Sequence, residues 1–199
     1  MSERREQLRG FYATEMKDRA SRPLGEDRER HLTEFVRECR LRGLTRVVEV
    51  GCGAGRDGTV IRDAGLAFQG LDLSAEAVRI CVGLDLEAVE GLATDLPFAD
   101  ASFDAGWSMR TLMHLEGDEI VTALSELSRV VRSGGMIEVG VWGHVHDGEH
   151  TAADGRYFRH RTDEAFQDLM SAVGAVEAFE TWDWQADDAH YQWARVVVR

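Results

Sequence analysis

Short apolar runs alternate with amphipathic stretches along most of the chain. Residues 46–50 form a β-branched run that leads directly into a glycine cluster, and residues 67–73 and 103–109 form similar runs. Residues 58–64, and the stretch that opens at Ser74, a preferred N-cap residue, have the character of helices. Strands that alternate with helices in this way predict a largely parallel sheet.

The two ends of the chain add a helix and a hairpin to this alternation. In residues 26–42, apolar side chains recur at a spacing near 3.6 residues, which predicts an amphipathic helix that ends at Gly43. The later elements are expected to be a helix over 118–132, a strand over 135–142, a helix over 162–173, and two apolar-rich strands over 175–184 and 190–198. The polar residues 185–188 join the last two strands, so a terminal antiparallel hairpin makes the expected sheet mixed.

Length and composition favour one globular domain. The chain has 199 residues, enough for one substantial core, and no Ser/Gly-rich tract or proline cluster suggests a linker. Its 44% apolar and 30% charged residues are far from the composition of a disordered protein. We therefore expect residues 1–199 to form a single domain.

Charge and cysteine content restrict the expected partners and compartment. The net charge of −13, from 23 Lys and Arg against 36 Asp and Glu, disfavours binding to nucleic acid or to an anionic membrane. No apolar run approaches the roughly 20 residues of a membrane-spanning helix, and the N-terminus lacks the apolar core of a signal peptide. The three cysteines lack metal-ligand spacing and are odd in number. We expect a cytoplasmic protein, a monomer or a homodimer, that binds neither nucleic acid nor membrane.

The glycine-rich turn at 51–55 (GCGAG) marks the expected ligand site. In an open α/β sheet, ligands bind beyond the carboxyl ends of the strands, and this turn follows the first strand. Because glycine has no Cβ, Gly51 and Gly53 allow the backbone to approach a ligand closely. A dinucleotide fingerprint requires a third glycine where this chain has Arg56, which argues against pyrophosphate binding.

The turn belongs to a longer series of motifs. The series consists of residues 49–55 (EVGCGAG), 70–74 (GLDLS), 93–98 (ATDLPF), 102–104 (SFD) and 127–135 (LSRVVRSGG). The first two resemble the first two motifs of class I S-adenosylmethionine-dependent methyltransferases, and the others follow in the family's order. The family usually has Pro-Gly-Gly where residues 133–135 are Ser-Gly-Gly. The resemblance covers residues 45–142 and implies an α/β, Rossmann-like, three-layer sandwich, in which a seven-stranded mixed sheet has helices on both faces and a C-terminal antiparallel hairpin.

By this resemblance the cofactor is S-adenosylmethionine and the product derived from it is S-adenosylhomocysteine. The glycine turn would face the methionine portion, and Asp72 would accept hydrogen bonds from both ribose hydroxyls. Asp95 and the backbone of Leu96 would bind the adenine, while Glu49 would organise the turn or meet the ammonium group. The other expected cofactor contacts are Tyr12, Arg28, Gly51, Cys52, Gly53, Leu73, Thr94, Ser108 and Met109. Taken singly, Asp72 could equally be a helix cap, Asp95 a turn residue and Glu49 a satisfied acid at the end of a strand.

Two segments outside the motifs are expected to lie near the substrate. Residues 1–44 form an N-terminal helical arm or lid, from which Tyr12 or Arg28 could reach the cofactor; a solvated charged arm is the alternative. Residues 143–161 form a substrate-side loop whose end, 156–161, is basic and aromatic. That end could receive a carboxylate or phosphate, or could pair with surface acids.

Histidines are the candidate catalytic groups. Methyl transfer needs an aligned nucleophile, exclusion of water and at most one base, and histidine suits proton transfer near neutral pH. His114, after the fourth strand, and His144, after the fifth, are the candidates; a capping or core-edge role is the alternative for His114. His144, His146 and His150 crowd one loop, but no second ligand cluster accompanies them, so no metal site is expected.

These observations together predict transfer of a methyl group to an O or N atom of a small-molecule acceptor. The chain has no Asn/Asp-Pro-Pro-Tyr/Phe motif of the type found in methyltransferases that act on exocyclic or amide nitrogens. Little of the chain lies outside the expected cofactor-binding sheet, which favours a small acceptor. Two alternatives stay open: a non-catalytic methyltransferase-like protein that binds the cofactor or acts as a scaffold, and a short nucleotide-dependent oxidoreductase.

Overall fold

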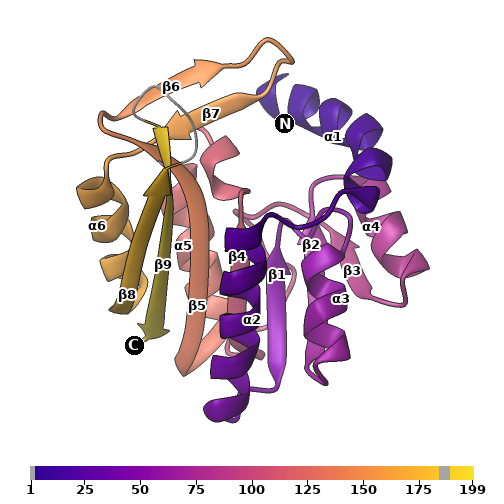
Figure 1. The fold of residues 1–199 in the computed structure, drawn as a ribbon, viewed down its shortest axis with the longest axis vertical. Helices are drawn as coiled ribbons and strands as arrows, with labels where there is room; N and C mark the ends of the chain where they lie inside the picture. The colour runs from indigo at the N-terminus through magenta and orange to yellow at the C-terminus, as the bar shows by residue number, and fades with distance from the viewer. Residues whose placement is uncertain (1–2, 184–188) are drawn as a thin grey trace.

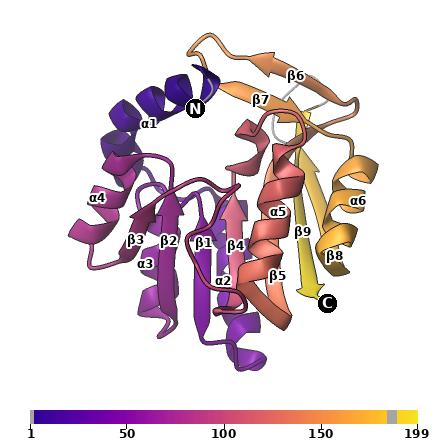
Figure 2. The same ribbon diagram turned by 180° about the vertical axis from the view of Figure 1, so that it is seen from behind.

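Seven strands form one mixed sheet in which the first and fourth strands are neighbours. The computed structural model describes residues 3–183 and 189–199 (Figures 1 and 2). The strand order is β3-β2-β1-β4-β5-β9-β8, with β9 antiparallel to β5 and β8 and the other pairs parallel. The strands are β1 (Arg46–Val50), β2 (Ala67–Asp72), β3 (Glu87–Glu90), β4 (Phe103–Met109), β5 (Val131–His144), β8 (Gly174–Asp183) and β9 (Ala189–Val198). Strand order reverses between β1 and β4, which opens a crevice beyond their carboxyl ends.

Helices cover both faces of this sheet. They are α1 (Glu3–Ser21), α2 (Glu26–Leu41), α3 (Arg56–Asp63), α4 (Ala75–Gly83), the short 3-10 helix η1 (Leu112–His114), α5 (Glu119–Val130) and α6 (Asp163–Val173). α2, α3 and α4 lie on one face, and α5 and α6 on the other (Figures 1 and 2). α1 lies beyond the carboxyl ends of the parallel strands and packs on α4, where Met16 belongs to a small apolar cluster with Ala54 and Ala77 (Figure 1).

Two apolar cores fix the sheet from its two sides. α5 presents Ile120, Leu124 and Leu127 at helical spacing to one core, and all three side chains are buried. On the opposite face, α2 packs Phe35 against Trp107 of β4, with ring centroids 4.7 Å apart. The strands whose ends carry the crevice are therefore held rigidly from both faces.

A second, two-stranded sheet stands above the carboxyl edge of the main sheet. It consists of β6 (Gly148–Thr151) and β7 (Tyr157–His160), which pair as an antiparallel hairpin. Phe158 of β7 is buried and stacks on Trp142 of β5, with ring centroids 5.0 Å apart. The hairpin and α1 lie on the same side of the molecule, above the ends of the parallel strands (Figures 1 and 2).

The predicted fold class is confirmed: the sheet has seven strands and is mixed, helices lie on both faces, and the chain closes with an antiparallel hairpin. The expected polar link at 185–188, and residue 184 before it, lie outside the described residues. Among the residues that the structure describes, no helix has the length and apolar character needed to cross a membrane.

Three details differ from the expected elements. The loop over 143–161 contains the β6–β7 hairpin, which the sequence pattern does not indicate because all four residues of β6 are exposed and none alternates with a buried neighbour. The four-residue strand β3 is too short to show a period. β5 begins at Val131 rather than after the Ser-Gly-Gly at 133–135, and its register with β4 shifts between Phe103 and Ala105 to accommodate the extra residues.

Candidate functional site

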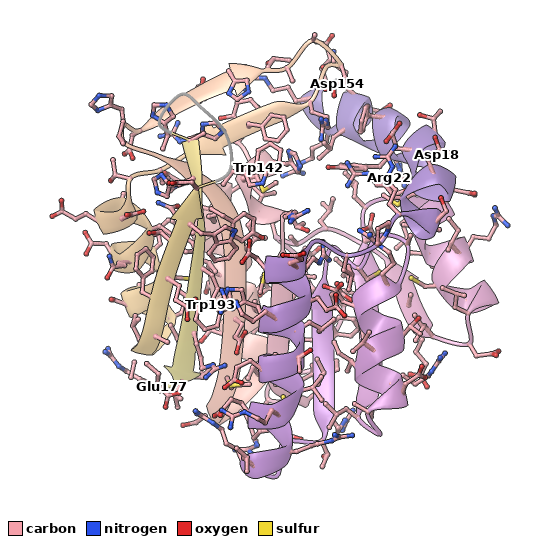
Figure 3. The ribbon with its side chains drawn as sticks, viewed as in Figure 1. Asp18, Arg22, Trp142, Asp154, Glu177 and Trp193 are labelled. Carbon is pink, nitrogen blue, oxygen red and sulfur yellow. The ribbon has the colours of Figure 1, made fainter. Side chains whose placement is uncertain are left out.

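A cavity lies beyond the carboxyl ends of β1, β2 and β4, where α1 covers the sheet. Its lining comes from the inner side of α1, the glycine turn after β1, the end of β2, the loop 91–94 and the segment 109–115 after β4. The cavity has a volume of about 130 Å³. Figure 3 labels Asp18 and Arg22 near the carboxyl end of α1, and Asp154 at the turn of the hairpin, beside the opposite end of that helix.

The glycine turn packs tightly against the segment that follows β4. Gly51 has φ +82°, and a Cβ at this position would lie 2.0 Å from Oγ1 of Thr111. Gly53 has φ +52° but open space, with the nearest side-chain atom, Sδ of Met16, 4.0 Å away. Glycine at 51 is therefore required both for the backbone conformation and for the close approach of residues 109–115.

Asp72, at the end of β2, organises the turn. Its Oδ2 accepts a hydrogen bond from the Gly53 amide at 2.8 Å, and its Oδ1 accepts one from the Ser74 amide at 2.8 Å. Burial raises the pKa of Asp72 above its ordinary value, while the amides of Ser74 and Gly53 act in the opposite direction. The same carboxylate lines the cavity, so it can face a ligand while it holds the turn.

The structure brings most of the predicted cofactor residues together. Those that line the cavity are Tyr12, Arg28, Gly51, Cys52, Gly53, Asp72, Leu73, Thr94 and Met109, together with the candidate base His114. Five other predicted residues are not part of the lining: Glu49, Asp95, Leu96, Ser108 and His144.

Asp95 and Leu96 are displaced from the place where the sequence prediction puts them. The Asp95 side chain is exposed to solvent, and the Leu96 amide donates a hydrogen bond to Oε2 of Glu126 at 2.8 Å. The segment lines the cavity with the residues just before them, 91–94. In this structure the backbone of Leu96 is already engaged by α5, because Arg129 of that helix also donates to its carbonyl at 3.0 Å.

Glu49 and Ser108 lie beneath the cavity rather than at its surface. Glu49 is fully buried, its carboxylate has no hydrogen-bond donor among the described residues, and Nη2 of Arg28 is 4.0 Å from its Oε1. Burial raises the pKa of Glu49 well above its ordinary value, and the carboxylate of Asp57 acts in the same direction. Ser108 donates its hydroxyl hydrogen to the carbonyl of Val50 at 2.9 Å and so ties β4 to β1.

Arg28 is held in place by an acid that the sequence analysis did not identify. Its Nε and Nη2 donate to the carboxylate of Asp57 at 2.7–3.1 Å, and Oδ2 of Asp57 also accepts the indole hydrogen of Trp107 at 2.7 Å. Asp57 lies in the first turn of α3, where a carboxylate is stabilised by the helix dipole. Its position two residues after the glycine turn is the only sequence feature that points to it.

His114 forms two hydrogen bonds that define its role. Its Nδ1 lies 2.8 Å from the carbonyl oxygen of Tyr157, which can only accept, so Nδ1 carries the hydrogen. Its Nε2 therefore has the free lone pair and accepts from the hydroxyl of Tyr12 at 2.9 Å. Burial lowers the pKa of His114 to about 4, with smaller contributions in the same direction from Arg156 and Arg19.

His144 lies in a separate group of histidines under the hairpin. Its Nδ1 accepts a hydrogen bond from the His146 amide at 3.2 Å, and its ring stacks with His160 at a centroid distance of 6.1 Å. His160 is also 4.9 Å from the ring of His150, and burial lowers its pKa to about 4. Within residues 3–183 and 189–199, no three His, Cys, Asp or Glu side chains are arranged to hold a metal ion.

The basic segment 156–161 pairs mainly with neighbouring protein groups. Arg156 pairs with Asp154 at 2.8 Å, and Arg159 pairs with Glu149 at 3.1 Å. The guanidinium carbon of Arg156 also lies 4.6 Å from the ring centroid of Phe11 and so joins the hairpin to α1. The segment therefore contributes to the contact between hairpin and arm.

Comparison with known proteins agrees with this geometry. Residues 48–139 match the family model described as "Methyltransferase domain". The O-methyltransferase resE of Aspergillus sclerotiorum is 32% identical over 102 residues, which are 47% of this chain and 38% of that protein. The demethylmenaquinone methyltransferase of Renibacterium salmoninarum is 36% identical over 101 residues, 50% of this chain and 42% of that protein. The chain thus spans less than half the length of these curated relatives.

A solved structure resembles almost the whole chain. It is the 1,6-didemethyltoxoflavin-N1-methyltransferase of Burkholderia thailandensis, crystallised with 1,6-didemethyltoxoflavin and S-adenosylhomocysteine. The likeness has a TM-score of 0.78 and covers 97% of this chain and 88% of that one, at 18% identity. At this identity the likeness establishes the fold and leaves the acceptor open.

Proposed function

The chain belongs to the class I S-adenosylmethionine-dependent methyltransferases, and from that premise we propose that it methylates an O or N atom of a small-molecule acceptor inside the cavity under α1. S-adenosylmethionine is the cofactor of this family. The names of its relatives include both oxygen and nitrogen acceptors. The sulfonium methyl group is intrinsically reactive, so the protein's task is alignment of the acceptor and exclusion of water.

The single observation that carries the proposal is the geometry of Asp72 and the glycine turn. A carboxylate at the end of β2 holds the turn after β1 through the Gly53 amide and still faces the cavity. A ribose with two adjacent hydroxyls can donate one hydrogen bond to each oxygen of such a carboxylate. The turn's amides would then face the methionine portion of the cofactor, and residues 91–94 would border the adenine.

The rest of the cavity supports transfer rather than cofactor storage. α1 and the segment 109–115 contribute the part of the lining outside the glycine turn, β2 and residues 91–94, and an acceptor would meet the sulfonium there. Tyr12, Met16 and Leu115 give that side an aromatic and apolar surface that excludes water. A short nucleotide-dependent oxidoreductase is less well supported, because Arg56 lines the cavity at the position of the third fingerprint glycine.

Calorimetry with S-adenosylhomocysteine tests the cofactor site. We expect Asp72→Ala to lower the affinity for S-adenosylhomocysteine by about tenfold or more, since it removes a charged acceptor of two hydrogen bonds. Asp72→Asn keeps one acceptor for the turn and should lose less affinity. Equal affinities in the wild type and Asp72→Ala would contradict the proposed cofactor pose.

Transfer itself is tested with cofactor labelled in the methyl group. Incubation of the wild-type chain with labelled cofactor and a small-molecule acceptor panel should move label into at least one acceptor. Tight binding of the cofactor without transfer to any small molecule would favour a non-catalytic, cofactor-binding protein instead.

A further inference from the structure

The cavity carries the opposite charge to the molecule as a whole. Six arginines line it, Arg5, Arg9, Arg19, Arg28, Arg56 and Arg110, whereas Asp72 is the only carboxylate in the described lining. The net charge of the chain is −13. Guanidinium groups that cluster in a partly buried site repel one another, so the arrangement is unfavourable unless negative charge balances it.

Three of these arginines are neutralised by carboxylates of the protein. Arg28 makes a bidentate pair with Asp57, Arg5 pairs with Glu119, and Arg9 pairs with Glu90. These pairs hold α1 and α2 against the body of the domain. Arg19 and Arg56 also line the cavity: Arg19 makes only a long ion pair with Glu15, and Arg56 donates to backbone carbonyls.

Arg56 lies at the cofactor end of the cavity. It is the first residue of α3, directly after the glycine turn, and its Nη1 donates to the carbonyls of Arg22 at 2.7 Å and Pro23 at 3.2 Å. Burial lowers the pKa of Arg56, and the nearby guanidinium groups of Arg28, Arg110 and Arg19 add to that effect. This end of the cavity therefore favours an anion, which the cofactor's own carboxylate supplies.

Arg19 lines the same cavity, beside the Tyr12–His114 pair. Its guanidinium carbon is 5.0 Å from the ring centroid of Tyr12, its ion pair with Glu15 is long at 3.9 Å, and its buried Nε has no acceptor among the described residues. Arg156 approaches the same pair from the hairpin, since it contributes to the lowered pKa of His114. The guanidinium of Arg19 thus borders the place where an acceptor would lie, and Arg156 adds positive charge from outside the lining.

The cofactor cannot balance this charge. S-adenosylmethionine carries a sulfonium, an ammonium and a carboxylate, so it brings one net positive charge into a site that is already positive. Its carboxylate can pair with Arg56, but its sulfonium adds positive charge to a cavity that Arg19 also lines. Electrostatic complementarity at this face requires a negative charge from the acceptor.

Among the side chains that the structure describes, the cavity has no group placed to take a proton from a neutral acceptor. Nε2 of His114 already accepts the Tyr12 hydroxyl, and this ring stays neutral down to a pH of about 4. Asp72 is engaged with the turn, and no other histidine and no lysine or glutamate belongs to the described lining. The nucleophile should therefore need no deprotonation by the protein.

We propose that the methyl acceptor is an organic anion, held beside Arg19 and the Tyr12–His114 pair, whose own ionised oxygen attacks the methyl group. This inference rests on the proposed methyltransferase function. In the transfer, the oxygen's electron pair forms the new O–C bond, the S–C bond breaks, and its electron pair stays on sulfur as a neutral thioether. No proton moves. The anion and the sulfonium both lose their charge, so the dry, apolar surroundings accelerate the step, and the neutral ester or ether is no longer attracted by Arg19.

Binding of matched acids and amides to the S-adenosylhomocysteine complex tests this inference. The probes are benzoate with benzamide, and hexanoate with hexanamide, each measured by calorimetry on protein saturated with S-adenosylhomocysteine. We expect at least one carboxylate to bind about tenfold or more tightly than its amide, as a charge-assisted pair should. Amides that bind as tightly as both acids would overturn the anionic assignment.

Variants at Arg19 identify the residue responsible. Arg19→Gln should weaken binding of the preferred carboxylate by about tenfold, Arg19→Lys should restore most of it, and binding of the matched amide should not change. Arg22→Gln, which removes one positive charge from the end of α1 outside the cavity lining, is the matched control. Unchanged carboxylate affinity in Arg19→Gln, or equal losses in Arg22→Gln, would refute the role of Arg19.

Binding of S-adenosylhomocysteine and preference for the acids are measured separately, so failure of the methyltransferase function can be told from failure of the anionic acceptor. Calorimetry with S-adenosylhomocysteine alone comes first. We expect the wild type and Arg19→Gln to bind S-adenosylhomocysteine with the same affinity. If S-adenosylhomocysteine does not bind, the proposed function fails and this inference fails with it. If it binds and the protein shows no preference for the acids, only the anionic acceptor is refuted.

Discussion

At the scale of single residues, the site shows how hydrogen bonds assign a chemical role to a side chain. The carbonyl of Tyr157 fixes the hydrogen of His114 on Nδ1, and the Tyr12 hydroxyl then occupies Nε2. A histidine in this setting is a neutral acceptor that positions Tyr12. Position in the sequence alone made His114 a candidate base; its partners make it a poor one.

The free energy of unfolding should depend on pH because the His114 ring is buried in its neutral form. The pKa of His114 is about 4 in the folded chain against 6.5 as its ordinary value, so burial of the neutral ring stabilises the fold fully above pH 6.5. That contribution is lost as the pH falls from 6.5 through 4. Relative to His114→Gln, which cannot titrate, the wild type should lose about 2 kcal/mol of unfolding free energy between pH 7 and 4.5.

Urea unfolding of both proteins at pH 7 and pH 4.5 measures this difference. Other titrating groups act equally in the two proteins and cancel in the comparison. A free-energy difference between wild type and variant that does not change with pH would show that the imidazole titrates normally and is open to solvent.

Sequence reasoning at this scale succeeds where a motif and a backbone requirement coincide. Gly51 and Asp72 belong to ordered motifs and both face the cavity, although their contacts with a cofactor stay predictions. Asp57 was missed, because an acid in the first turn of a helix is common and its partners, Arg28 and Trp107, are distant in sequence. The displacement of Leu96 depends on Glu126 in another helix, which no local pattern encodes.

At the scale of elements, the arm and the hairpin form a joined cover over the sheet edge. Tyr12 of α1 bonds to His114 of η1, while Arg156 of the hairpin lies over Phe11 of α1 and 5.1 Å from the ring of Phe158. The guanidinium of Arg4 in turn lies 4.5 Å from the ring centroid of Tyr157. Each of these contacts is worth about 0.5–1 kcal/mol at a partly exposed site, so the cover is held by several weak bonds rather than by one strong one.

Loss of Arg156 should loosen α1. Arg156→Gln removes the cation–π contact with Phe11 of α1, worth about 0.5–1 kcal/mol, so amide hydrogen exchange in residues 8–12 should accelerate by about twofold to fivefold. Arg159→Gln removes an ion pair with Glu149 inside the hairpin and is the control. Hydrogen exchange followed by mass spectrometry measures both. Similar exchange of α1 in the two variants would show that Arg156 does not hold the arm.

The sequence predicts those elements in which buried side chains recur at a regular spacing or in an unbroken run. α5 buries one stripe, and β4 is buried along most of its length, so both follow from their own residues. β6 is exposed on both faces and takes its place from the pairing with β7 and from Phe158, which packs on Trp142. Its existence is a tertiary effect, and the pattern over 143–161 could therefore indicate only a loop.

At the scale of the whole molecule, average charge and local charge point in opposite directions. The sequence total of −13 correctly describes the outer surface, where most arginines pair with Asp or Glu. It conceals the positive cavity, which forms only when α1 folds back over the strand ends and brings Arg19 beside residues that lie far away in sequence. The basic segment 156–161, the only positive feature visible as a run, is used mainly in ion pairs within the hairpin.

Because the cavity joins α1 to the ends of β1, β2 and β4, a bound ligand should stabilise the entire fold. A ligand that binds only the folded chain adds about 2.7 kcal/mol of unfolding free energy at a concentration of one hundred times its Kd. For a domain of this size that corresponds to a rise in Tm of about 5–10 °C. We expect S-adenosylhomocysteine to produce this rise in the wild type, in one cooperative transition, and a much smaller one in Asp72→Ala at the same concentration. A rise of the same size in both proteins would place the ligand away from β2, and a second transition that the ligand leaves unmoved would mean that part of the chain unfolds independently of the site.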